Sequence, residues 1–115
     1  MYGLTVRWSL ADAPDGVDEA LRDYVHGTSL ARFSAMDGLR FKTWRTRSGE
    51  WFEGTYVFAT AEARDQFAAA FAASADGSPG SQLIGSSPIL QETFDVVAVA
   101  EGAAGFASGP GPVPM

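Results

Sequence analysis

The sequence has 115 residues and a mass of 12.1 kDa, enough for one domain but not for two independent hydrophobic cores. Its 14 acidic and 8 basic residues give a net charge of −6, which argues against a nucleic-acid partner and against binding to anionic lipid. It contains no cysteine and only one histidine. Disulfides, thiolate nucleophiles and metal sites rich in histidine or cysteine are therefore excluded within this chain.

The N-terminal residues carry no pattern of a secretory leader. Residues 1–8 alternate in polarity and include Arg7, whereas a leader needs an unbroken apolar stretch before its cleavage site. No segment approaches the roughly 20 apolar residues that a membrane-spanning helix requires. We therefore expect a soluble, cytoplasmic protein without a membrane partner.

The first half of the chain alternates between strand and helix patterns. Residues 2–10 alternate apolar and polar side chains, which predicts a strand, and residues 17–36 return apolar side chains at helical spacing. Asp15 is predicted to cap this helix, and residues 27–29 are predicted to kink or restart it. Two further strands are expected over residues 39–47 and 51–59, joined by a short glycine-containing hairpin loop.

The second half adds one helix and one strand. We expect Thr60 to cap a helix that ends near Ser74, then a loop, a helical turn within residues 81–87 and a strand over residues 89–100. The order β-α-β-β-α-β predicts an α+β fold of the ferredoxin-like type, a four-stranded antiparallel sheet with two helices on one face. The domain is expected to span residues 1–101.

Residues 102–115 form a tail rich in glycine, alanine and proline. It is either a flexible end or a cover over a cleft, anchored by Phe106 and Val113.

Two helices can cover only one face of such a sheet. Depending on which alternate residues face the helices, the uncovered face carries Val57 or Phe58, Phe41 or Trp44, and Val97 or Ala98. Because an apolar face of this kind is unfavourable in water, we predict a homodimer packed sheet to sheet.

Four stretches of the chain resemble one known family in their order and spacing. They are Leu4-Thr5-Val6-Arg7-Trp8 in the first strand, Gly38-Leu39-Arg40-Phe41-Lys42-Thr43-Trp44 (similar to Gly-Phe-x-x-Lys-x-Trp) in the second, Gly54-Thr55-Tyr56-Val57-Phe58 (similar to Gly-x-Tyr-x-Phe) in the third, and Phe94-Asp95-Val96 (similar to Phe-Asp-Val) in the fourth. Over about residues 2–100 the chain thus resembles the dimeric α+β barrel superfamily with its antibiotic-biosynthesis-type monooxygenases, and within it the YdhR-like monooxygenases. The sequence departs from the family pattern near residues 26–28, where the first helix carries a few extra residues.

The resemblance implies a cofactor-independent, monooxygenase-like enzyme that oxidises an electron-rich aromatic molecule, such as an anthrone or a hydroquinone, to a quinone. His26 is the candidate base for a phenolic or enolic proton, because imidazole titrates near neutral pH. The resulting anion would react directly with dioxygen, so no cofactor and no metal are expected. In the alternative interpretation, His26 is a partly exposed histidine at a helix break; a haem would need it as an axial ligand.

Aromatic side chains on the predicted strands and helices are candidates for a ligand pocket. They are Trp8, Phe33, Trp44, Tyr56, Phe58 and Phe67. A small aromatic ligand requires an apolar pocket with a few polar groups, which the Tyr56 hydroxyl and the Trp44 indole N–H would supply. Tyr56 is therefore the second candidate catalytic residue. The alternative is that these side chains form an ordinary hydrophobic core.

Five of the eight basic residues fall within one short part of the chain: Arg32, Arg40, Lys42, Arg45 and Arg47. They could attract an anionic substrate, or they could form a solvated strand face that pairs with Glu50 and Glu53.

Asp95 lies within an apolar strand. It could tune a base or accept a hydrogen bond from Tyr56, or it could be exposed or paired with an arginine in a dimer.

Three functions fit these observations. The first is the cofactor-independent oxygenase. The second is a non-catalytic dimeric module that binds a hydrophobic metabolite, which needs the aromatic pocket but no base. The third is a cyclase or isomerase on the same fold, which needs proton transfer but no dioxygen.

Overall fold

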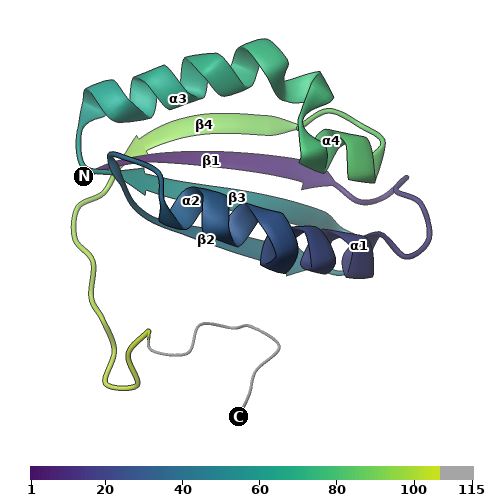
Figure 1. The fold of residues 1–115 in the computed structure, drawn as a ribbon, viewed down its shortest axis with the longest axis horizontal. Coiled ribbons are helices and arrows are strands. Elements are labelled where there is room, and N and C mark those ends of the chain that lie inside the picture. Colours follow the sequence, from purple (N-terminus) through teal and green to yellow (C-terminus); the bar gives the residue numbers. More distant parts are fainter. Residues whose placement is uncertain (107–115) are drawn as a thin grey trace.

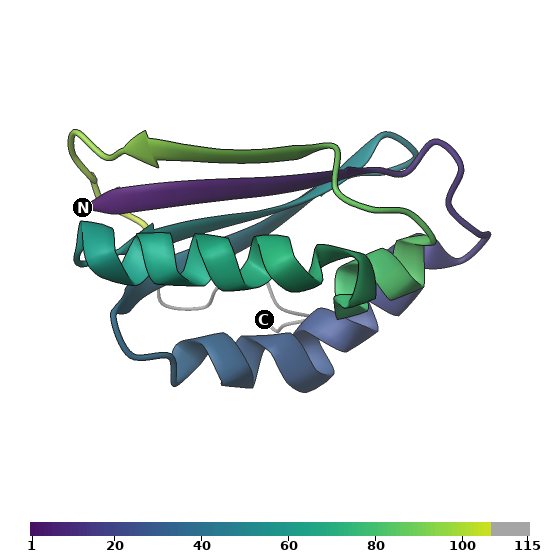
Figure 2. The ribbon, with the colours of Figure 1, turned by 90° about the horizontal axis from the view of Figure 1, so that it is seen from above.

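Four antiparallel strands form a single sheet in the order β2-β3-β1-β4 in the computed structural model, which describes residues 1–106 (Figure 1). The strands are β1 (Tyr2–Ser9), β2 (Leu39–Arg47), β3 (Trp51–Phe58) and β4 (Leu90–Asp95). The helices are α1 (Val17–Tyr24), α2 (Leu30–Ser34), α3 (Ala61–Ser74) and α4 (Pro79–Ile84). All of them lie on one side of the sheet (Figure 2), which confirms the predicted α+β, ferredoxin-like fold.

The first helical segment is continuous but not regular. Between α1 and α2 the backbone forms a π turn, Val25–Ser29, in which the N–H of Leu30 donates to the carbonyl of Val25, five residues back. The predicted interruption is therefore confirmed in its place, but it is a π turn and not a capped restart. Asp15 as the cap was wrong. The N-cap is Gly16, which adopts a left-handed conformation (φ 81°) and offers no side-chain bond.

The second helix begins as predicted. The Thr60 hydroxyl accepts the backbone N–H of Ala63 at 3.1 Å, a regular N-cap bond, and α3 then extends to Ser74. The last strand is shorter than predicted and ends at Asp95. Asp95 is paired with Tyr2, the first residue of β1, and one backbone hydrogen bond lies beyond this pair, from the N–H of Val96 to the carbonyl of Met1 at 3.0 Å.

Strand alternation places one set of side chains under the helices. Leu4, Val6 and Trp8 of β1 all face this side and are almost fully buried. They join apolar residues of β3 and the helices in one core, which also contains Leu10, Leu21, Val25, Phe33, Phe52, Tyr56, Phe58 and Ile84. None of the helices within residues 1–106 is long and apolar enough to cross a membrane.

The other face of the sheet, which we call the open face, meets no other element among residues 1–106 (Figure 2). At its centre, Glu53 is 1% exposed and accepts Nε of Arg7 and Nε of Arg45, both at 2.9 Å. Burial alone would raise the pKa of Glu53, but hydrogen bonds from Arg45 and Arg7 and their positive charges outweigh it and lower the pKa. The open face is therefore organised around a satisfied buried carboxylate.

Candidate functional site

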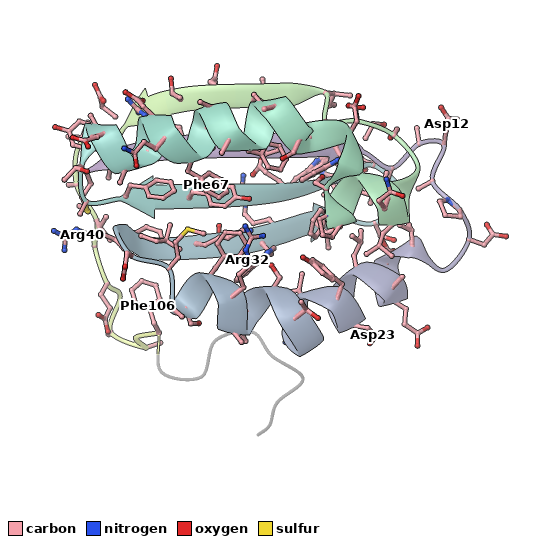
Figure 3. The ribbon with its side chains drawn as sticks, turned by 45° about the horizontal axis from the view of Figure 1, so that its top comes forward. Asp12, Asp23, Arg32, Arg40, Phe67 and Phe106 are labelled. Carbon is pink, nitrogen blue, oxygen red and sulfur yellow. The ribbon has the colours of Figure 1, made fainter. Side chains whose placement is uncertain are left out.

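A cavity of about 560 Å³ lies over the helix-covered face of the sheet. Its walls come from three places: the α1–α2 segment on one side, α3 and the turn after it on the other, and β1, β2 and β3 below. Figure 3 shows Arg32 of α2 and Phe67 of α3 on opposite sides of this space. The volume falls within the range of cavities that hold small molecules in other proteins.

Aromatic rings make up much of one end of the cavity. The ring of Phe33 contacts those of Tyr56, Trp44 and Phe67 edge to face, with centroids 5.6 to 6.0 Å apart. The Tyr56 and Phe67 rings are closer still, at 4.8 Å. Because these rings hold one another in place, the cavity has rigid, apolar walls suited to a flat ligand.

The side chain of Lys42 projects among these rings. Its Nζ lies 3.5 Å from the ring centroid of Phe33, 4.3 Å from that of Tyr56 and 4.6 Å from that of Trp44. None of the ion pairs formed within residues 1–106 includes Lys42. It is also the only lysine of the sequence.

In this environment the amine of Lys42 is harder to protonate than it is in water. Burial among apolar groups lowers its pKa, and the positive charge of Arg32 lowers it further, to about 6. The three ring faces attract the ammonium form and offset part of the cost of burial. At neutral pH the amine is therefore mostly unprotonated, and its lone pair is available to accept a proton or to act as a nucleophile.

The hydroxyl of Tyr56 lies beside this amine. A Cβ placed on Gly54 would lie 3.2 Å from Cε of Lys42 and 3.3 Å from the Tyr56 hydroxyl oxygen. The absence of a side chain at Gly54 therefore leaves room between the end of the Lys42 side chain and the Tyr56 hydroxyl. Burial raises the pKa of Tyr56, while the charge of Arg32 acts in the opposite direction, so the phenol stays protonated and can donate a hydrogen bond.

Arg32 lies at the rim of the cavity, since its side chain is exposed and also lines the space. Its guanidinium carbon is 4.7 Å from the centroid of the Phe33 ring, the same ring that Lys42 contacts. One end of the cavity thus combines aromatic walls with two basic groups.

At the other end of the cavity, a small hydrogen-bond network fixes the wall. The indole N–H of Trp8 donates to the Ser81 hydroxyl at 3.0 Å, which in turn donates to the carbonyl of Ala75 at 2.6 Å. A Cβ on Gly80 would lie only 3.0 Å from the Trp8 ring, so this backbone packs directly against the indole. The polar atom of Trp8 is therefore used by the protein, and only its ring faces the cavity.

Five of the seven predicted site residues line this cavity: Trp8, Phe33, Trp44, Tyr56 and Phe67. Two do not. Phe58 is 1% exposed and stacks beside Tyr56 as part of the core, and His26 is exposed and is not among the lining residues.

The π turn determines which residue after Tyr24 faces the cavity. Tyr24 and Ser29, five residues apart, both line the cavity, whereas in a regular α-helix the residue aligned with Tyr24 would be Thr28. His26 follows Tyr24 by two residues and would face away from the cavity in either kind of turn, and residues 26–28 are exposed.

Two other candidates also lie apart from the site. Asp95 is exposed at the end of β4, and Phe106 is 70% exposed, so neither lines the cavity. Val113, the other predicted anchor of the tail, lies outside the described residues. Within residues 1–106, no group of three or more histidine, aspartate or glutamate side chains is placed to hold a metal ion.

Lys42 and Arg32 are not among the predicted site residues, because they fall in the same run of basic residues as Arg45 and Arg47. A solvated face that pairs with Glu50 and Glu53 was one of the two interpretations of that run. It is right for Arg45 and Arg47, which pair with Glu53 and Glu50. Strand alternation held the missing signal, because Lys42 must share a face with Trp44 and not with Arg45.

Comparison with known proteins adds a likeness in fold. No family model matches the sequence, and no curated protein matches it either. Among solved structures, the chain is similar to NE2512, a protein of unknown function from Nitrosomonas europaea, with 24% sequence identity and a TM-score of 0.62. The match covers 89% of this chain and 94% of that one, so the likeness extends over the whole sheet and its helices.

Proposed function

We propose that the protein is a small, cofactor-independent enzyme that binds a flat phenolic or enolic aromatic molecule and removes a proton from it with Lys42. The observation that carries the proposal is the position of the Lys42 amine inside an aromatic cavity, with Nζ 3.5 Å from the centroid of the Phe33 ring and without a carboxylate partner in the described part of the chain. Burial there lowers its pKa to about 6. His26, the base expected from the sequence, is exposed outside the cavity and has no part in this proposal.

The surrounding groups suit the anion that proton removal creates. The Tyr56 phenol, kept protonated by burial, donates a hydrogen bond to the new oxyanion, and Arg32 contributes a positive charge. The walls of Phe33, Trp44 and Phe67 hold the ring flat and exclude water. Lys42 then carries the proton as an ammonium among the ring faces.

The resemblance to the monooxygenases supplies the next step of the proposal. An electron-rich carbanion or enolate reacts with dioxygen without a metal or flavin. For an anthrone, one oxygen atom becomes the new carbonyl oxygen of the quinone, and the other leaves as water together with the two hydrogens of the methylene carbon. The protein contributes the deprotonation and the alignment.

The test is oxygen consumption with a panel of anthrones and hydroquinones. We expect Lys42→Met to lower kcat by about 100-fold or more, because general-base catalysis contributes that much. His26→Ala is the control and should stay within about twofold of the wild type, since proton transfer at this site does not use it. Activity of the wild type should rise with pH around the pKa of Lys42, about 6. Full activity of Lys42→Met would contradict the proposal.

The position of His26 favours a second candidate, a binding module without turnover. It would show ligand-dependent stabilisation but neither oxygen consumption nor exchange of substrate protons with deuterated water. Exchange without oxygen consumption would instead indicate a cyclase or isomerase.

We further propose that two copies pack through the open face. Two exposed apolar side chains, Phe41 (40%) on β2 and Leu90 (37%) on β4, share the open face with Glu53, and a partner sheet would cover them. Light scattering should give twice the mass of the chain. Phe41→Glu should shift this mass to that of a monomer, whereas a wild-type monomer at micromolar concentration would contradict the proposal.

A further inference from the structure

The two basic groups of the cavity, Arg32 and Lys42, form no ion pair with the described part of the chain. Arg32 and Lys42 lie 4.7 and 3.5 Å from the centroid of the same Phe33 ring. Their mutual repulsion contributes to the lowered pKa of Lys42. A second positive charge beside Arg32 is therefore unfavourable in the empty cavity.

Four other arginines are satisfied by the protein itself. Arg7 and Arg45 bind Glu53, Arg47 binds Glu50, and Arg64 binds Asp65 together with the backbone carbonyls of Gly3 and Phe94. Of the remaining three, Arg22, Arg32 and Arg40, only Arg32 lines the cavity. All three form no ion pair within residues 1–106, so Arg32 is the one arginine that both lines the cavity and is left unpaired there.

One carboxylate does line the cavity, but it is placed elsewhere. Asp76 belongs to the short turn after α3, next to the wall that Trp8 and Ser81 form. Its carboxylate accepts a hydrogen bond from the Ser87 hydroxyl. At the aromatic end, therefore, no carboxylate among the residues that line the cavity pairs with Arg32 or Lys42.

We infer that the molecule bound here carries a carboxylate that Arg32 holds at the rim, while its phenolic or enolic hydroxyl reaches Lys42 and Tyr56. The substrate class is that of aromatic hydroxy acids. This inference rests on the proposed function, because it assigns the second polar group of the same ligand. A guanidinium suits the task, since it offers paired N–H donors to a carboxylate and remains charged at every physiological pH.

The size and shape of the site agree with such a ligand. A fused bicyclic hydroxy acid fits within about 560 Å³ and can pack against the cavity side of the rings of Phe33, Trp44 and Phe67, which contact one another and leave no gap between them. With the carboxylate on exposed Arg32 and the hydroxyl at half-buried Lys42, the charged end stays near water and the reacting end is less solvated.

The experiment compares 6-hydroxy-2-naphthoate with its carboxamide, which has the same shape and hydroxyl but no charge. Affinities are measured by calorimetry on the full chain at pH 7 and low salt. The variants are Arg32→Gln and the control Arg40→Gln, whose side chain is exposed, does not line the cavity and points away from it (Figure 3). Thermal unfolding of each variant verifies that it is folded.

We expect the wild type and Arg40→Gln to prefer the carboxylate by about tenfold, the size of one charge-assisted contact. In Arg32→Gln the preference should fall to about twofold or less, while the carboxamide binds as before. Equal binding of both probes to the wild type, or the same preference in Arg32→Gln, would overturn the inference and leave the proposed function standing. If neither probe binds the wild type, both the inference and the proposed function fail.

Discussion

The basic residues on the two faces of the sheet differ in their charge partners, although Lys42 and Arg45 lie only three residues apart on β2. On the open face, Arg45 and Arg7 converge on Glu53, and the ion pairs serve the structure. On the helix-covered face, Lys42 lies among aromatic rings with Arg32 as its charged neighbour, and it forms no ion pair within residues 1–106. A protein retains such an unfavourable arrangement where a ligand or a reaction uses it. This contrast is the reason for proposing that the covered face carries the function.

Removal of the buried acid on the open face should cause the largest loss of stability. Glu53→Gln keeps the shape but loses the charge that Arg7 and Arg45 bind, and we expect it to lower the free energy of unfolding by about 2 to 3 kcal/mol. Urea denaturation measures this change. Glu50→Gln is the matched control, because its pair with Arg47 is exposed on both sides and should contribute less than about 0.5 kcal/mol. If the two substitutions lowered the free energy of unfolding equally, the buried ion pairs of Glu53 would contribute no more to stability than the exposed pair of Glu50.

Removal of the basic group on the covered face should have the opposite sign. Lys42→Met replaces a desolvated amine with an apolar side chain of similar length, and we expect the free energy of unfolding at pH 7 to rise by about 2 kcal/mol. The same variant should lose activity. A destabilised Lys42→Met would show that the amine stabilises the fold and is not held there for chemistry.

The pH dependence of stability should separate the two faces as well. The folded-state pKa of Lys42, about 6, lies below its ordinary value of 10.5, so between these values the unfolded chain binds a proton that the folded protein does not. The wild type should therefore gain stability relative to Lys42→Met as the pH rises through that window. For Glu53 the pKa is lowered from its ordinary 4.5, so its stabilisation is complete above that pH and is lost as the pH falls below it. Parallel pH profiles for wild type and Lys42→Met would contradict the assignment.

A smaller effect is expected from the floor of the cavity. Gly54→Ala places a methyl group within 3.3 Å of Lys42 Cε and the Tyr56 hydroxyl, which should weaken binding of 6-hydroxy-2-naphthoate about fivefold. Calorimetry measures the change. Gly27→Ala is the control, because a Cβ there meets nothing within 4 Å and Gly27 does not line the cavity. Unchanged affinity in Gly54→Ala would place the ligand elsewhere in the cavity.

The fold could be predicted from the sequence because its signals are local. Alternation in β1, the Thr60 cap and the hairpin at Gly49 each depend on neighbouring residues, and each is confirmed. The π turn, in contrast, has no such signal in the residues that form it. It brings Ser29 to the cavity in the place that Thr28 would take in a regular α-helix. His26 was wrong for a different reason, because it follows Tyr24 by two residues and so points away from the cavity whichever turn forms.

The same limit applies to the chemistry of Lys42. A lysine in a run of basic residues normally belongs to a solvated face, as Arg45 and Arg47 do here. What changes its character is desolvation by Phe33, Trp44 and Tyr56, which come from three different elements. Only the assembled fold brings those rings together.

The most direct test of this account is the titration of Lys42 by NMR. Because the sequence has a single lysine, labelling of the lysine Cε carbon gives one side-chain resonance to follow with pH. The account predicts a midpoint near 6, and a higher midpoint in Arg32→Gln, where the repelling charge is gone. A midpoint at the ordinary value of 10.5 in both proteins would mean that Lys42 is a protonated surface cation at neutral pH, and the proposed site would have no base.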